Sequence, residues 1–253
     1  MGRRSAIGLI GGLAALAAAA LVLVPAIPQD PAYHRLADSR AWLGIPNALN
    51  VLSNTGFLLV GALGLAYVAA GGRPAFREPG ERWPYVVFFG GLLLTGFGSA
   101  YYHWEPGNAR LAWDRLPLAI TLMGLLAATI TERIGVKAGL WLLGPLVLIA
   151  AGSVIYWHWT EQRGAGDLRL YALVQFYPVV AIPLMLWWLP PRYTRGGELL
   201  AAAVTYAAAK VPELLDGWIL SATRVVSGHT LKHLLAALAG YWVLRMLRHR
   251  RPA

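Results

Sequence analysis

Residues 84–103 read PYVVFFGGLLLTGFGSAYYH and contain no Asp, Glu, Lys or Arg. An apolar stretch of about 18 residues or more is long enough to cross a bilayer as a helix. A helix also satisfies its own backbone hydrogen bonds, as a chain in lipid must. The stretch therefore predicts a transmembrane helix with His103 at its end and Ser99 one turn earlier on the same face.

Apolar blocks of this kind make up most of the chain. We expect eight spans, at residues 6–27, 48–70, 84–103, 116–134, 138–157, 170–189, 198–221 and 228–247. Only 13% of the residues are charged, whereas about a quarter is usual in soluble domains. The connections are short and leave no room for a soluble domain. The predicted fold class is an all-α integral membrane protein, a seven-transmembrane helix bundle with one additional N-terminal helix.

The basic residues indicate how the bundle is oriented. The net charge is +10, and Lys and Arg are more frequent in the segments that share the N-terminal side of the membrane. By the positive-inside rule both termini lie inside, and His103 lies toward the outer face. In a soluble protein such a charge would suggest a nucleic-acid partner. Arginines in loops beside apolar spans instead contact lipid head groups. We expect no nucleic-acid partner.

Five polar residues from distant parts of the chain meet at this outer level, namely Ser99, His103, Asp114, His229 and His233. Each alone has a plain structural explanation, since a His-x3-His pair, an interfacial histidine and a helix-packing serine are all common. Ionisable groups are costly inside a membrane, however, and here they gather. Three imidazoles with one open position are typical of catalytic zinc. A carboxylate nearby can move a proton, and a hydroxyl can stabilise an oxyanion. The chain has no cysteine, so thiolate metal sites are excluded.

Three short motifs also resemble a known family. They are GSAYYH at 98–103, WDRLP at 113–117 and SGHTLKH at 227–233. Their order and spacing are similar to the signature motifs of alkaline ceramidases. The same motifs mark the wider superfamily that includes adiponectin-type receptors and Per1-like lipid-remodelling proteins. The resemblance covers residues 48–253 and suggests a bacterial-type member of the family.

The resemblance implies a zinc ion (Zn2+) held by three histidines, which are His103, His229 and His233. Asp114 would be the general base, and Ser99 would contact the oxygen held by the metal or the substrate carbonyl. Tyr171 resembles a tyrosine that stabilises the oxyanion, although an interfacial tyrosine is an equal alternative. The substrate would be a ceramide, cleaved to a sphingoid base and a free fatty acid. The chain would then be a metal-dependent amidase acting on linear amides.

Two departures from the family pattern concern the substrate and a second metal. Eukaryotic alkaline ceramidases carry an acidic calcium-binding stretch before the first core helix. This chain has Asp38 there, but with Arg40 and few other carboxylates, whereas calcium prefers six or more oxygen ligands. Lys232 stands where ceramidases usually have an aromatic residue. The contacts to the lipid head group are therefore expected to differ.

The chain divides into three regions by this interpretation. Residues 1–27 form an N-terminal transmembrane anchor or an uncleaved signal-like helix, because two arginines precede an Ala/Leu/Gly run. Residues 28–47 form an outer interfacial segment, and 48–253 a seven-helix transmembrane hydrolase domain. The partners expected are the bilayer and a membrane lipid substrate. High Ala, Gly and Arg usage favours a bacterial inner membrane with the site toward the periplasmic face.

Alternatives remain open at this level. A member of the same fold could sense or remodel lipids with little amidase turnover. A transporter could use Lys210, Glu213 and Asp216 as an ion relay, although the first two are most simply an internal ion pair.

Three smaller expectations concern packing. A polar stripe at the opening of the second predicted span should make helix–helix hydrogen bonds, and it consists of Asn47, Asn50, Ser53 and Asn54. Acyl chains should enter sideways into a pocket lined by residues such as Phe97, Phe176 and Trp218. Histidines outside the cluster, namely His34, His158 and His249, should be interfacial or solvated.

Overall fold

A computed structural model describes residues 2–71 and 75–253, which form helices and no strand beyond two isolated bridges. The longer helices are α1 (Arg3–Leu23), α3 (Thr55–Ala69), α4 (Trp83–Trp104), α5 (Asn108–Arg133), α6 (Val136–Glu161), α7 (Arg169–Trp188), α8 (Gly196–Ala208) and α11 (Gly228–His249). The shorter ones are η1 (Pro31–His34), α2 (Ala48–Leu52), η2 (Pro79–Arg82), α9 (Lys210–Leu214) and α10 (Asp216–Thr223).

Six helical segments in the described part of the chain are long and apolar enough to cross a membrane. They are Arg3–Leu23, Ala48–Ala69, Pro79–Trp104, Asn108–Arg133, Val136–Glu161 and Arg169–Trp188. The chain is therefore an all-helical protein with the character of a multi-pass membrane protein. The two remaining predicted spans fall on α8 to α10 and on α11, and their membrane passage stays a prediction.

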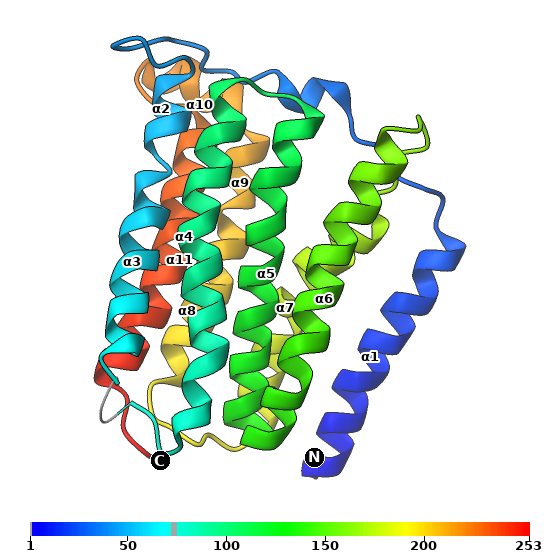
Figure 1. Cartoon of the computed structure of the whole chain (residues 1–253), viewed down its shortest axis with the longest axis vertical. Helices are drawn as coiled ribbons and strands as arrows, with labels where there is room; N and C mark the ends of the chain where they lie inside the picture. The colour runs from blue at the N-terminus through cyan, green and yellow to red at the C-terminus, as the bar shows by residue number, and fades with distance from the viewer. Residues whose placement is uncertain (1, 72–74) are drawn as a thin grey trace.

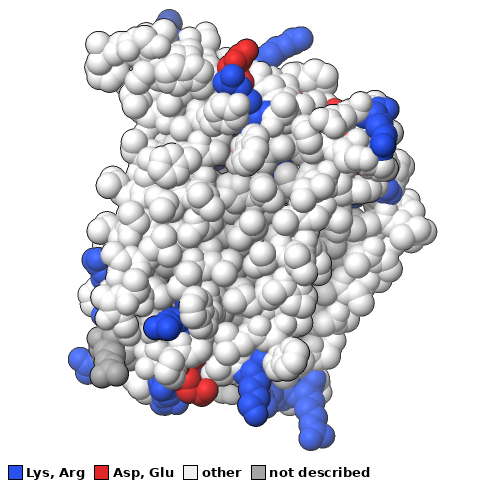
Figure 2. All heavy atoms as spheres, viewed as in Figure 1, with Lys and Arg blue, Asp and Glu red and all other residues white. Residues whose placement is uncertain are grey.

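The surface has the charge distribution expected of such a protein. Figure 2 shows Lys, Arg, Asp and Glu mostly toward the two ends of the visible face, with a broad uncharged band between them. Large apolar side chains such as Trp141 and Trp187 are exposed on the helix surfaces. A soluble monomer rarely exposes continuous apolar surface of this kind, but lipid accommodates it.

Small residues let the helices approach closely, which is the usual basis of helix packing in lipid. A Cβ on Gly98 of α4 would lie 2.0 Å from the Trp113 carbonyl oxygen of α5. A Cβ on Gly139 of α6 would lie 1.9 Å from Thr131 Oγ1, also on α5. Helix α5 therefore sits at the centre of close contacts with both neighbours in the chain.

Helix α1 lies at the edge of the bundle, where it packs mainly against α7 (Figure 1). Only Ala6 and Ile10 of this helix are buried. Its upper end is held by Arg169, which donates to the Leu21 carbonyl at 2.6 Å. Both chain termini lie at the same end of the molecule in Figure 1.

The predicted span 198–221 is an interrupted helix rather than a regular one. It is divided at Ala209 and Leu215 into α8, α9 and α10. Pro212 lies within α9 and has no backbone N–H, so the carbonyl four residues earlier loses its helical donor. Two further prolines, Pro178 and Pro183, lie inside α7, which remains one helix.

Candidate metal centre

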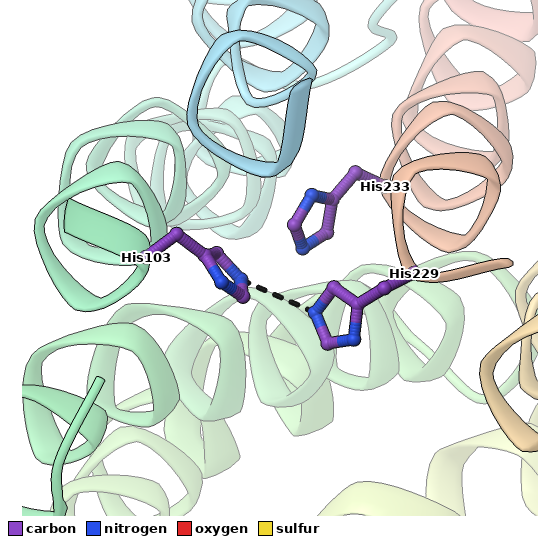
Figure 3. A group of neighbouring side chains, drawn as sticks. All are labelled: His103, His229 and His233. Atoms are coloured by element: carbon purple, nitrogen blue, oxygen red, sulfur yellow. Dashed lines mark hydrogen bonds between the residues drawn. The ribbon is translucent and has the colours of Figure 1, made fainter. Parts of the chain in front are cut away.

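Three buried histidines face one another at one end of the bundle (Figure 3). His103 comes from the last turn of α4, and His229 and His233 come from the first two turns of α11. Their potential ligand nitrogens all lie within 4.8 Å of one another. The predicted cluster therefore forms, and it could hold a metal ion.

One pair of ring nitrogens already has the spacing that a shared metal ion requires. His229 Nε2 and His103 Nε2 lie 3.2 Å apart. Two nitrogens bound to zinc at about 2.0–2.1 Å in a tetrahedron are separated by roughly 3.4 Å. Nδ1 of His103 is buried without a hydrogen-bond partner among the described residues. Three buried imidazoles this close together can direct their lone pairs to one shared cation.

The ring of His233 is oriented by Ser53, a member of the polar stripe. Ser53 Oγ lies 2.8 Å from His233 Nδ1 and 3.1 Å from the Asn50 carbonyl oxygen. The hydroxyl can donate its single proton to the carbonyl and accept from Nδ1–H. That arrangement leaves the Nε2 lone pair of His233 free for a metal, and metal-binding histidines usually have such a partner on the other nitrogen.

Asn47 and Asn50 of the polar stripe make the helix–helix hydrogen bonds that the sequence predicts, whereas among the described residues Asn54 donates only to the Asn50 and Val51 carbonyls of the preceding turn. Asn47 Nδ2 donates to the His103 carbonyl at 2.8 Å. Thr230 Oγ1 donates to Asn50 Oδ1 at 3.1 Å. The start of α2 is thereby tied to both helices that carry the histidines.

The start of α11 is held by three features that fix His229. Ser227 is the N-cap and accepts from the Thr230 backbone N–H. Asp216 Oδ1 accepts from the His229 N–H at 2.7 Å, so this carboxylate reaches the site through the backbone. A Cβ on Gly228 would lie 1.9 Å from the Pro212 carbonyl oxygen, so only glycine lets α11 begin against α9.

A cavity of about 660 Å³ lies beside the histidines, among α4, α5, α7, α9 and α11. Ser99, Asp114, Tyr171 and His233 all line it. The other predicted site residues thus share one space with the cluster. The close approach at Gly98 explains the position of Asp114. It brings the backbone of α4, one residue before Ser99, against the backbone of α5 at Trp113, one residue before Asp114.

A surface ion pair with the adjacent Arg115 would be a plain structural explanation of Asp114. Arg115 does not form that ion pair. It is 7% exposed, and its Nη2 donates to Gln29 Oε1 at 2.6 Å. Its guanidinium lies 4.3 Å from the Trp157 ring centroid and 4.9 Å from that of Tyr171. Asp114 is thereby left to face the cavity.

The predicted pocket lining was right in only one of three residues. Phe176 lines the cavity, whereas Phe97 and Trp218 are exposed on the outside of the helices and do not. The sequence places all three near the outer level, but it does not give the rotation of a helix about its axis.

Lysines form the part of the site that the motifs alone did not predict. Lys210 and Glu213 make the expected ion pair at 2.8 Å, and Lys232 binds the same carboxylate at 3.0 Å. The ammonium of Lys232 also lies 2.9 Å from His229 Nε2. A metal on that nitrogen would require this ammonium to withdraw toward Glu213, which already binds it.

The segment 28–47 lies over this end of the bundle and is bound at several points. His34 is not solvated, because its ring contacts Tyr102 Oη at 3.0 Å and Asn108 Oδ1 at 2.8 Å. Arg40 donates to Asp38 and to the Val225 carbonyl. The hydrogen bond from Arg40 holds the pKa of the Asp38 carboxyl below its usual range. Asp38 is thus a structural residue that anchors the segment.

Comparison with protein-family models and with curated protein sequences gives no match. The resemblance described from the sequence therefore rests on its three short motifs alone.

Proposed function

We propose that this chain is a zinc-dependent membrane hydrolase that cleaves the amide bond of ceramide-like N-acyl lipids to a free fatty acid and an amine such as a sphingoid base. The observation that carries the proposal is the buried cluster of His103, His229 and His233 beside a cavity lined by Ser99 and Asp114. Such a set combines metal ligands, a proton acceptor and a hydroxyl in one space.

The proposed setting is a bundle of seven transmembrane helices with α1 as an additional N-terminal helix. Helices α8 to α10 would together form one span and α11 another. Both termini would be cytoplasmic, and the site would face the periplasm of a bacterium. The excess of basic residues at the opposite end from the histidines supports this orientation.

A divalent metal held by three imidazoles lowers the pKa of a water molecule and polarises a carbonyl group. His103, His229 and His233 would hold it, with Ser53 fixing the ring of His233. A metal held by these three histidines would still be able to bind a water molecule, as in other catalytic sites of this type.

The remaining residues would handle protons and charge. The oxygen of a water molecule bonds to the carbonyl carbon, and Asp114 takes a proton from that water. The C–N bond then breaks, and Asp114 returns the proton to the departing nitrogen. Ser99 and Tyr171 can donate hydroxyl protons to the carbonyl oxygen as it gains negative charge. All three side chains line the cavity.

The test uses the full-length protein in detergent with a panel of ceramides and other N-acyl lipids. Mass spectrometry would measure released fatty acid for the wild type, Asp114→Asn and His229→Ala. Asp114→Asn should lower kcat by about 10²- to 10⁴-fold, the usual contribution of a general base. Asp30→Asn is the matched control, because Asp30 caps η1 and does not line the cavity.

The outcomes separate the candidates. Release by the wild type and the control alone supports the amidase. Equal release by all four proteins contradicts it. Binding of metal and lipid without any release would favour a lipid-sensing or lipid-remodelling member of the same fold.

A further inference from the structure

The polar half of the cavity carries more positive than negative side chains. Lys210, Lys232 and Arg115 line it together with two carboxylates, Asp114 and Glu213. A bound divalent metal would add further positive charge. Uncompensated charge is costly in an apolar interior, so this imbalance needs a reason.

One carboxylate serves both lysines. Glu213 binds Lys210 through Oε2 at 2.8 Å and Lys232 through Oε1 at 3.0 Å. It also accepts from the Tyr33 hydroxyl at 3.3 Å. A single negative charge cannot neutralise two ammonium groups, so one positive charge remains in the cavity.

Arg115 adds a third positive charge and Asp114 a second negative one, so the five groups together carry one excess positive charge. The guanidinium of Arg115 also lacks a full set of hydrogen-bond partners. Its Nη2 is bound by a neutral amide, that of Gln29. Its Nη1 is buried and has no hydrogen-bond partner among the described residues. The aromatic rings around it stabilise a cation but do not neutralise it.

The two lysines lie along a path from the membrane to the histidines. Phe176 on α7 and Leu214 on α9 line the cavity and are 48% and 85% exposed, so the cavity opens sideways between these helices. Lys210 stands at this opening, with its Nζ 6.0 Å from the Phe176 ring centroid. Lys232 stands at the inner end, against His229.

An apolar extension continues on the other side of the cavity. A second, smaller cavity of about 50 Å³ shares Phe57, Leu118, Tyr206 and Ala236 with the first. Its remaining lining is almost wholly apolar and includes Leu92. This lining suits the apolar part of a lipid, which leaves the lysine end for the head group.

We infer that the substrate is an N-acyl lipid whose head group carries an anionic group, a carboxylate or a phosphate, bound by Lys210 and Lys232. This rests on the proposed amidase function and narrows its substrate class. A neutral ceramide offers hydroxyl groups, which hydrogen-bond to ammonium groups but leave their charge uncompensated. An anion removes the imbalance, and a metal on the three histidines would attract it further.

The test compares two pairs of lipids with the same acyl chain. The first pair is N-palmitoylglycine, which has a carboxylate, and neutral N-palmitoylethanolamine. The second pair is ceramide phosphate and ceramide. The purified full-length protein should show a higher kcat/KM for the anionic member of at least one pair, by about tenfold or more, the size of one charge-assisted hydrogen bond. The pair that responds identifies carboxylate or phosphate as the preferred group.

Variants assign the preference to the lysines. Lys210→Gln and Lys232→Gln should each reduce the anionic-to-neutral ratio of kcat/KM by about tenfold. Lys137→Gln is the matched control, because Lys137 lies at the start of α6 and does not line the cavity. Its ratio should equal that of the wild type. The ratio is insensitive to a general loss of active protein, which would lower both values equally.

Equilibrium binding of the same lipids to chelator-treated protein distinguishes the two proposals. Tighter binding of the anionic lipid, lost in Lys210→Gln, supports the head-group inference even if no lipid is cleaved and the amidase fails. Cleavage of both members of each pair with equal kcat/KM overturns the inference and leaves the amidase in place. If the anionic and neutral lipids bind equally and the untreated protein cleaves neither, both the head-group inference and the amidase proposal are overturned.

Discussion

Ser53 shows what single residues contribute beyond the recognised motifs. The sequence identifies the three histidines because their residue type is rare in membrane helices and their spacing matches a metal site. It predicts that the polar stripe bonds to other helices, but it does not identify His233 as the partner of Ser53, because the two residues are 180 positions apart. From the sequence, Lys232 stands out only because it replaces an aromatic residue of the family pattern. Its contacts with Glu213 and His229 required the structure.

Ser53→Ala should weaken metal binding without unfolding the bundle. Loss of a partner on the second nitrogen of a metal-binding histidine usually lowers affinity by about 10- to 100-fold. Competition with a chromophoric zinc chelator would measure the change. Thr55→Ala is a matched control, since the Thr55 hydroxyl bonds only the Leu52 carbonyl in its own segment. Equal affinities in the two variants would show that Ser53 does not orient His233.

At the scale of elements, glycines and caps place the site. The helices themselves follow from apolar composition, and most predicted spans correspond to helical segments within a few residues. Three spans differ: α5 begins at Asn108 rather than at 116, and the spans 48–70 and 198–221 are each divided into shorter helices. In the span 198–221 the missing N–H of Pro212 contributes to the interruption. Gly98 and Gly228 stand beside site residues in the sequence, yet their role depends on which helix packs against them. That information lies in tertiary contacts with α5 and α9.

Gly98→Ala should impair both stability and activity. The added methyl group would meet the Trp113 carbonyl oxygen at 2.0 Å, so α4 and α5 must separate and Asp114 must move relative to Ser99. Overpacking of this kind costs about 1–3 kcal/mol. Gly90→Ala in the same helix is the control, because a Cβ there meets nothing within 4 Å. Thermal unfolding and fatty-acid release would be measured for both variants. An unfolding temperature and activity equal to those of the control would contradict the packing account.

At the scale of the whole molecule, the two ends of the bundle have different roles. The end with the histidines carries the cavity and the covering segment 28–47. The opposite end is fastened by a buried polar cluster in which Arg250 binds Glu132 and Tyr85. The sequence predicts the sidedness of the chain from its basic residues. It cannot pair Arg250 with a residue 118 positions away, since such pairs depend on how the helices are arranged.

Cysteine labelling tests the sidedness directly, because the chain has no native cysteine. Ser39→Cys lies in the covering segment, and Gly197→Cys lies at the start of α8 at the other end. In right-side-out vesicles a membrane-impermeant maleimide should label the Ser39→Cys protein at once. It should label the Gly197→Cys protein only after detergent is added. The unsubstituted protein should remain unlabelled. The reverse pattern would place the histidines on the cytoplasmic side.

The most direct test of the central claim is removal and restoration of the metal in one preparation. Fatty-acid release from the N-acyl lipid panel would be followed before chelation, after chelation and after zinc is added back, with bound metal measured at each stage. The account predicts about one zinc per chain at the start, loss of release with loss of metal, and recovery with zinc. Release that continues unchanged from metal-free protein would contradict it.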